Sequence, residues 1–214
     1  MLIAPESYYE TEVKGKSISH IKAEIRRLRR EFNEDRQLAE ETSHSEVFME
    51  KPSYSMRAQF DLEYLEKAKQ ALIEAGGVYV PTKAEERNKQ FNAKVKTITN
   101  IHISYGGFWD GFECRNLFFD KRSVFIQSYK MPLEGEYQSF KIYQHYMDTS
   151  RFLKEIELLN LGDWKKYYCN DILDGTEWTL ELTFSNGKVK KFCGCNAFPY
   201  NFDKLIALLD PEEE

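Results

Sequence analysis

The sequence predicts an α+β protein, with an N-terminal antiparallel helical hairpin followed by an antiparallel β-sheet with two flanking helices. Three observations support this. Apolar residues recur at helical spacing in the first half of the chain, strand-like runs separated by turn residues fill the second half, and the pattern changes near Lys96. We therefore expect two domains, the helical hairpin with a short further helix over residues 1–95 and the sheet with its helices over residues 96–214.

Two long helices are predicted first. One runs from Ser17, a suitable capping residue, to about Thr42, and the other from about Ser55 to Ala75, before Gly76-Gly77. Helices of similar length joined by a linker of about 12 residues are expected to pack as an antiparallel hairpin. Their predicted buried stripes are Ile18, Ile21, Ile25, Leu28, Phe32 and Leu38, and Ala58, Leu62, Leu65, Ala68 or Lys69, and Leu72.

A short polar helix follows the hairpin. Thr82 and Glu85 have the spacing of a capping box, in which each residue caps the other at a helix start. We expect this helix to extend to about Lys94.

The second half of the chain reads as strands and then a helix. A helix is expected from Asp148 or Thr149 to just before Gly162. The strands that precede it are predicted at Ile98–Tyr105, Gly111–Phe119, Arg122–Met131 and Ser139–Tyr146.

The clearest local signal is a hairpin near the C-terminus. Asn186-Gly187 lies between strands predicted at Trp178–Phe184 and Lys188–Cys195, and a closing helix is expected from Asn201. Trp178, Leu180, Leu182 and Phe184 alternate with polar residues, so they should form a buried face. Before this hairpin, Trp164, Tyr167 and Tyr168 are predicted to end a short helix.

The segment around this hairpin resembles a module of uncharacterised proteins from gut Firmicutes and their mobile elements. The resemblance is carried by Asp174–Trp178, Asn186-Gly187, Gly194–Pro199 and Asn201-Phe202, and Met1–Ile25 is similar to the start of the same proteins. It extends over most of the chain. It implies a source of this kind and no particular activity.

Composition narrows the classes of function. The chain has 214 residues and a net charge of −5, all of which arises in residues 97–214. Such a chain lacks the broad positive field of a non-specific nucleic-acid-binding protein. There is no signal-peptide pattern and no apolar run of about 20 residues that could span a membrane. With four cysteines in a chain without a secretion signal, the sequence predicts a cytoplasmic protein with reduced thiols.

Catalytic and metal-binding patterns are weak. Cys169, Cys193 and Cys195 suggest a zinc site, but the spacing of one residue is unusual and a fourth ligand is lacking, so packed thiols are the favoured interpretation. We find no phosphate-binding loop, dinucleotide fingerprint, zinc-protease motif or nucleophile elbow. His102 is expected to bond locally within a strand. No metal and no cofactor are therefore predicted.

Two surfaces remain as candidate binding sites. Phe108, Trp109 and Asp110 form a glycine-flanked aromatic turn that suits protein binding, although the aromatic rings can equally cap the sheet. Arg26, Arg29 and Arg30 belong to a basic cluster that suits phosphates, although interleaved glutamates favour ion pairs along a solvated helix.

The leading hypothesis is a non-enzymatic protein that binds another protein, of the host or of a mobile element. The first alternative is a nucleic-acid-associated module that uses the Arg26–Arg30 cluster. The second is an enzyme of unrecognised type with a pocket near Trp109, Asp110 and His102. The sequence does not specify the oligomeric state.

Overall fold

The computed structural model describes residues 2–42, 52–107, 111–131, 140–145, 147–170 and 175–210. The chain divides into two compact units, Met1–Pro81 and Thr82–Glu214, called here the helical unit and the sheet unit. Each is described by itself.

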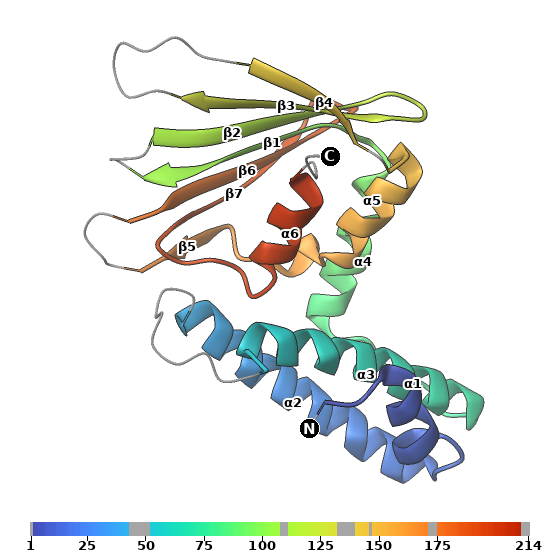
Figure 1. Cartoon of the computed structure of the whole chain (residues 1–214). Coiled ribbons are helices and arrows are strands. Elements are labelled where there is room, and N and C mark those ends of the chain that lie inside the picture. The colour runs from blue at the N-terminus through green and yellow to red at the C-terminus, as the bar shows by residue number, and fades with distance from the viewer. Residues whose placement is uncertain are drawn as a thin grey trace. The chain divides into compact units, whose positions relative to one another are not determined.

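The helical unit is built on the predicted hairpin (Figure 1). Helices α2 (Ile18–Thr42) and α3 (Tyr54–Glu74) pack against each other as expected. The Ser17 hydroxyl accepts a hydrogen bond from the His20 amide at 3.3 Å, which caps the start of α2. At the end of α3, Gly76 has a φ of +78°, and the Gly77 amide donates to the Leu72 carbonyl at 2.8 Å. This is the glycine C-cap that the sequence predicts.

An N-terminal helical segment, not predicted from the sequence, packs on this hairpin. It consists of α1 (Pro5–Tyr8) and the π-helical turn η1 (Tyr9–Val13). The segment contributes Tyr8 and Val13 to the core of the helical unit. The segment is too short to show a helical repeat in the sequence. The other buried residues of this core are Ile21, Ile25, Leu28, Tyr64, Leu65, Ala68, Ala71 and Leu72.

Helix α4 (Lys83–Val95) begins with the predicted capping box. The Thr82 hydroxyl accepts from the Glu85 amide at 3.2 Å, and the Glu85 carboxylate accepts from the Thr82 amide at 2.6 Å. This helix falls in the first domain predicted from the sequence, residues 1–95, whereas it packs with the sheet unit. The ring of Phe91 meets that of Phe184 edge-on at 6.4 Å, and the side-chain Nδ2 of Asn92 donates to the Glu157 carbonyl.

Within the described residues, the sheet has seven strands in the order β4-β3-β2-β1-β6-β7-β5. All neighbours are antiparallel except β5 and β7, which are parallel. The strands are β1 (Ile98–Gly107), β2 (Gly111–Phe119), β3 (Val124–Met131), β4 (Phe140–His145), β5 (Tyr167–Cys169), β6 (Glu177–Phe184) and β7 (Val189–Cys195).

Strand β5 corrects the predicted helix end at Tyr167 and Tyr168. The Cys193 amide donates to the Lys166 carbonyl, and the Asn170 amide donates to the Cys195 carbonyl, so backbone pairing with β7 holds this segment extended. Its pairing partner lies far along the sequence, and a three-residue strand shows no periodicity of its own. The spacing of the aromatic residues therefore predicted a helix end where the structure has a strand.

The helices of the sheet unit all cover one face of the sheet (Figure 1). The two flanking helices predicted from the sequence are α5 (Thr149–Leu158) and α6 (Phe202–Leu209). Helix α4 lies on the same face as a third helix. A short 3-10 turn, η2 (Leu161–Asp163), follows α5. Their apolar side chains pack on Ile101, Ile103 and other inward residues of the strands. Trp178 lies in this core, as predicted, with 1 % of its surface exposed.

Candidate functional site

The helical unit contains a cavity of about 480 Å³ between the N-terminal segment and helices α2 and α3. Five carboxylates and two guanidinium groups line it, together with tyrosine and aliphatic side chains. We call it the acidic cavity. Its lining residues are Leu2, Ile3, Tyr8, Glu12, Arg27, Leu28, Glu31, Glu34, Asp35, Arg57, Asp61 and Tyr64.

Two tyrosines fix the N-terminal segment as one wall of this cavity. The Tyr64 hydroxyl accepts from the Ile3 amide at 2.9 Å and donates to the Ile3 carbonyl at 2.6 Å. The rings of Tyr8 and Tyr64 stack at a centroid distance of 4.5 Å. Backbone bonding and ring stacking therefore hold this segment against α3.

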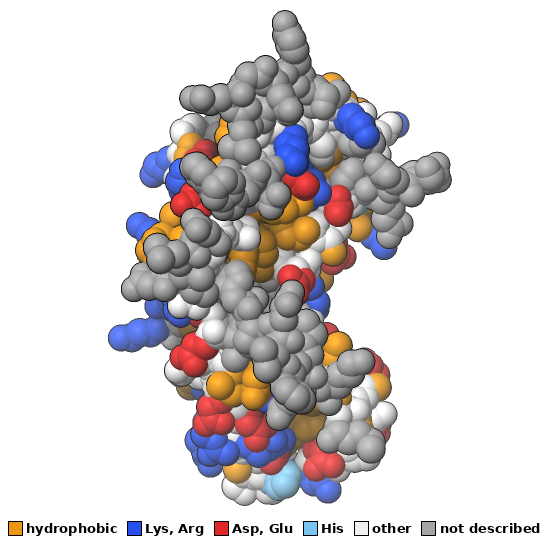
Figure 2. All heavy atoms as spheres, turned by 60° about the vertical axis from the view of Figure 1, so that its left-hand side comes forward, with side chains coloured by type: hydrophobic (Ala, Val, Ile, Leu, Met, Phe, Trp, Pro, Cys, Tyr) orange, Lys and Arg blue, Asp and Glu red, His pale blue; other side chains and the backbone are white. Residues whose placement is uncertain are grey.

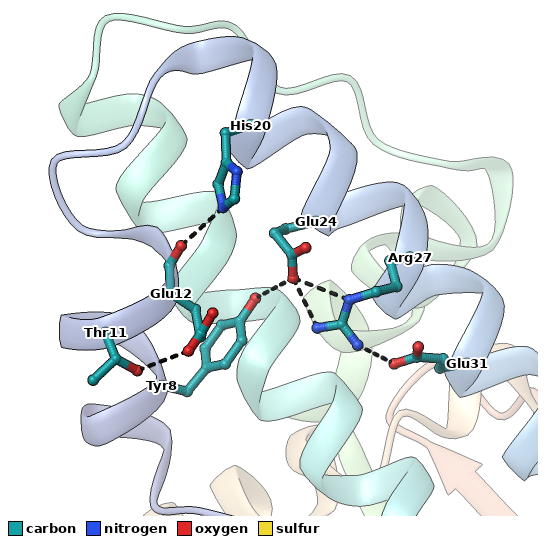
Figure 3. Close-up of polar contacts among 7 residues, drawn as sticks. All are labelled: Tyr8, Thr11, Glu12, His20, Glu24, Arg27 and Glu31. Carbon is teal, nitrogen blue, oxygen red and sulfur yellow. Dashed lines mark hydrogen bonds and ion pairs between the residues drawn. The ribbon is translucent and has the colours of Figure 1, made fainter.

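Figure 3 shows that an ion-pair network projects from α2 toward this wall. Arg27 donates to the Glu24 carboxylate at 2.7 Å and to the Glu31 carboxylate at 2.5 Å, and the Tyr8 hydroxyl donates to Glu24 at 3.4 Å. Spacings of three and four residues bring these side chains together on one helix face. The bond from Arg27 lowers the pKa of Glu24, whereas burial and the Glu24 charge raise the pKa of Tyr8. The charge of Arg27 is thus already shared between two carboxylates.

A separate set of contacts joins the π-helical turn to the start of α2. His20 Nε2 lies 3.1 Å from the Glu12 carbonyl oxygen, and the Thr11 hydroxyl donates to the Glu12 carboxylate at 3.2 Å (Figure 3). These bonds hold the π-helical turn beside α2. Single π-turns of this kind often occur at functional sites.

Asp61 is the most unusual residue of the cavity. Only 7 % of it is exposed, and its Oδ2 atom has no hydrogen-bond partner among the described residues. Burial is the main cause that raises the pKa of Asp61 to about 7, and the negative charges of Asp35 and Glu31 add to it. Arg27 and Arg57 act in the opposite direction. An ionised carboxylate in this position lacks the solvation and hydrogen bonds that normally stabilise it.

Both guanidinium groups that line the cavity in the described residues form ion pairs with carboxylates other than Asp61. Arg57 forms an ion pair with Asp35 at 2.9 Å, and Arg27 bridges Glu24 and Glu31. With five carboxylates against two guanidinium groups among its described lining residues, this part of the cavity has an excess of negative charge near neutral pH. Its chemistry is therefore that of a cation-binding site with aromatic and aliphatic walls.

The apolar repeat of α3 contained a signal for Asp61 that the sequence analysis missed. Ala58, Asp61, Leu65, Ala68 and Leu72 are spaced by three and four residues, which is the spacing of a buried stripe. Leu62, which is predicted to belong to this stripe, is only half-buried, whereas Asp61 is buried. An acidic residue at a core position of a helix is the feature that would have identified this site.

The arginines of the predicted nucleic-acid site differ in their surroundings. Arg29 donates to the Tyr79 hydroxyl at 2.6 Å and to the Val80 carbonyl at 3.1 Å, and its guanidinium lies over the Tyr79 ring. Arg30 lies 3.8 Å from Glu34, and Arg26 is exposed. On the face that Figure 2 displays, basic and acidic side chains are interleaved. Nucleic-acid binding by this cluster stays an untested alternative.

The other predicted sites have different outcomes. Phe108, Trp109 and Asp110 lie outside the described residues. His102 is on the sheet face opposite the helices, where its Nδ1 is 2.7 Å from the Asn116 side-chain oxygen. This is the local bonding that the sequence analysis expects for His102.

The cysteines of β5 and β7 come together on that same sheet face. Cys169 is the register partner of Cys195, and Tyr167 is the partner of Cys193. Gly194 between them faces the core, where a side chain would collide with the Trp178 ring. No group of three or more histidine, cysteine or acidic side chains in the described residues is arranged to hold a metal ion. The packing of Trp178 therefore explains the glycine between the two cysteines.

Comparisons with known proteins add no assignment. No protein-family model, no curated protein and no solved structure was found to match this chain. Among the described residues, none of the helices combines the length and the apolar character needed to cross a membrane.

Proposed function

We propose that this protein is a non-enzymatic binding protein that recognises another protein by accepting one of its basic side chains in the acidic cavity. The observation that carries the proposal is Asp61, a carboxylate that lines the cavity, is almost fully buried and lacks a hydrogen-bond partner for Oδ2 among the described residues. A buried polar atom without a partner costs stability. A cation supplied by a partner would remove that cost in the complex.

Arginine is the side chain that fits this cavity best. Its planar guanidinium carries five donors and can bond two carboxylate oxygens at once, which a lysine ammonium does with less geometric definition. Asp61, Asp35 and Glu31 supply acceptors, and Tyr8 and Tyr64 supply the aromatic wall. Arginine is also enriched among the residues that dominate binding energy at protein interfaces.

The cellular setting is part of the same proposal. The four cysteines are present as thiols, which supports a cytoplasmic location. The resemblance of the C-terminal hairpin to proteins of mobile elements supports an accessory protein whose partner belongs to the host or to the element.

Competition between peptides on the pure protein would test the arginine preference. Fluorescently labelled peptides that differ only in a central Arg, Lys or norleucine are titrated against the protein, and anisotropy is measured. We expect the arginine peptide to bind most tightly, and its affinity to increase from pH 6 to pH 8 as Asp61 ionises. Equal binding of the norleucine peptide would contradict the proposal.

The Asp61→Asn variant provides the structural control for this test. Asparagine preserves the shape of the side chain and removes its charge, so arginine-peptide binding should weaken by about tenfold or more. Glu63→Gln removes an equal charge from an exposed position of the same helix and should leave binding unchanged.

Affinity capture from the native host with wild-type, Asp61→Asn and Glu63→Gln proteins then identifies the partner. A partner retained equally by all three would place the interface elsewhere.

A further inference from the structure

The sheet unit contains a second cavity, of about 620 Å³, with the opposite charge. Among the described residues, four basic side chains and no acidic side chain line it. We call it the basic cavity, and it lies in a different unit from the acidic cavity. Its lining residues are Arg87, Gln90, Phe91, Lys94, Thr97, Gly162, Phe184, Ser185, Asn186, Lys188, Val189 and Lys190.

Two distant parts of the chain form this cavity. Arg87, Gln90, Phe91 and Lys94 share one face of α4, because they are spaced by three, four and seven residues. The opposite side is the β6–β7 hairpin with its Asn186-Gly187 turn. The Ser185 amide donates to the Thr97 carbonyl at 2.7 Å, which ties the hairpin to the end of α4.

Lys190 is the central cation of the basic cavity. It pairs in register with Leu182, so its side chain lies on the helix-covered face of the sheet, while its neighbour Lys191 lies on the other face. The Lys190 ammonium is 4.4 Å from the centroid of the Phe91 ring and 4.9 Å from that of Phe192. Aromatic rings therefore support the ammonium from the core side.

The charged groups around Lys190 are mainly of the same sign. Burial lowers the pKa of Lys190, and the charges of Lys94 and Lys166 lower it further. Within the part of the chain that the structure describes, Lys94, Lys188 and Lys190 form no ion pair, whereas Arg87 contacts Asp163 at 3.4 Å. Three ammonium groups that have no ion-pair partner among the described residues thus line one cavity.

From this arrangement we infer that the basic cavity binds the phosphoryl group of a small molecule whose apolar or aromatic part contacts Phe91, Phe184 and Val189. A phosphoryl dianion offers three oxygens to the three lysines, and lysine is a common ligand of phosphate. The Phe91 and Phe184 rings are buried and form an apolar floor beside the ammonium groups. The site requires both the charge and the apolar surface.

Three ligands distinguish these requirements. Phenyl phosphate, inorganic phosphate and benzoate are titrated into the full-length protein at constant ionic strength, and heat is measured by calorimetry. We expect phenyl phosphate to bind about tenfold more tightly than either of the other two, because only it supplies both the dianion and the ring. Benzoate binding as tightly as phenyl phosphate would overturn the phosphoryl assignment, and equal binding of inorganic and phenyl phosphate would overturn the apolar part.

Variants on one strand provide the matched control. Lys190→Met keeps the length of the side chain over the phenylalanine rings and removes the charge, so phenyl phosphate affinity should fall by about tenfold or more. Lys190→Arg should recover most of the loss. Lys191→Met removes the same charge from the other sheet face, where Lys191 pairs with Glu181 at 2.9 Å, and should have no effect. Equal losses in Lys190→Met and Lys191→Met would show a general charge effect and overturn the site.

Two further measurements complete the test. Lys188→Met changes an exposed position of the cavity lining and should also weaken phenyl phosphate binding, which keeps the test decisive if Lys190→Met fails to fold. A labelled single-stranded oligonucleotide is titrated in parallel by anisotropy. Oligonucleotide binding that is much tighter than phenyl phosphate binding, and that is lost in Lys188→Met, would replace the small molecule by a nucleic-acid backbone.

Discussion

The helical unit and the sheet unit each contain a cavity beside an apolar core. The two cavities differ in whether the charged side chains that line them form ion pairs. Most of the charged side chains that the structure describes around the acidic cavity form ion pairs, as in Arg27 with Glu31 and Arg57 with Asp35, and Asp61 is the buried exception. In the basic cavity, the three lysines have no ion-pair partner among the described residues, and Arg87 is the exception.

This difference follows from how the two cavities are assembled. The ion pairs of the helical unit come largely from neighbouring turns of one helix, where a sequence can place opposite charges three or four residues apart. The basic cavity brings α4 together with a hairpin about ninety residues further along the chain. Complementary charges are thus a local property in one unit, whereas the accumulation of like charge in the other requires the tertiary fold.

The largest expected effect is a loss of stability that is confined to the sheet unit. Trp178→Ala should destabilise the sheet unit by roughly 3–5 kcal/mol, because a large buried aromatic is removed. Trp178 packs against Trp164, Phe198 and Phe202, and its indole donates to the Ala197 carbonyl at 2.8 Å. Urea unfolding followed by tryptophan fluorescence measures this, since all three tryptophans of the chain belong to the sheet unit.

The matched control for this change is Thr179→Ala, at the next position of β6 on the other sheet face. It should shift stability by no more than about 1 kcal/mol. Far-UV circular dichroism on the same samples follows the helices of both units, and the part of its transition that comes from α2 and α3 should stay near its wild-type position in Trp178→Ala. A fluorescence transition that does not move would contradict the central role of Trp178.

A smaller effect on stability is expected at Asp61, where substitution should stabilise the protein. The folded protein raises the pKa of Asp61 from 3.8 to about 7, so between these values the folded state retains a proton that the unfolded state has lost. This group therefore lowers wild-type stability as pH rises from about 4 to just above 7. Asp61→Asn should be more stable than wild type at pH 8, by roughly 1–3 kcal/mol, and the difference should disappear near pH 4.

Urea unfolding of the helical signal at pH 4, 6 and 8 measures this difference. Glu63→Gln, on the exposed side of α3, should show no comparable change with pH. A wild-type protein that is more stable than Asp61→Asn at pH 8 would mean that Asp61 has a stabilising partner, and the acidic cavity would then be a structural ion-pair cluster.

The smallest effects concern the arginine cluster of α2. Arg29→Ala should cost roughly 0.5–1 kcal/mol, because it removes the contacts of Arg29 with Tyr79 and Val80. Arg26→Ala, at an exposed position, should stay within about 0.5 kcal/mol of wild type. Urea unfolding measures the stability of both variants.

Salt-sensitive, sub-micromolar nucleic-acid binding that a triple Arg26, Arg29 and Arg30 to Ala variant abolishes would instead support the nucleic-acid alternative.

Where local chemistry dominates, the sequence by itself predicted the structure. The hairpin helices, the Thr82–Glu85 capping box and the Gly76 C-cap depend on residues within one or two turns of each other. The Asn186-Gly187 hairpin is of the same kind, because Gly187 adopts the positive φ that the turn requires. The burial of Trp178 followed from the alternation of apolar residues in one strand.

Only the tertiary structure decided the features that depend on distant partners. Strand β5 exists because Tyr167–Cys169 pairs with β7, and α4 packs with the sheet through contacts such as Phe91 with Phe184. Asp61 lies on a predictable helical stripe. Among the described residues its Oδ2 atom has no hydrogen-bond partner, because Arg27 and Arg57 form ion pairs with other carboxylates. The lysines of the basic cavity are unremarkable in sequence. Their proximity, and with it the proposed anion site, arises from the folding of separate segments around one space.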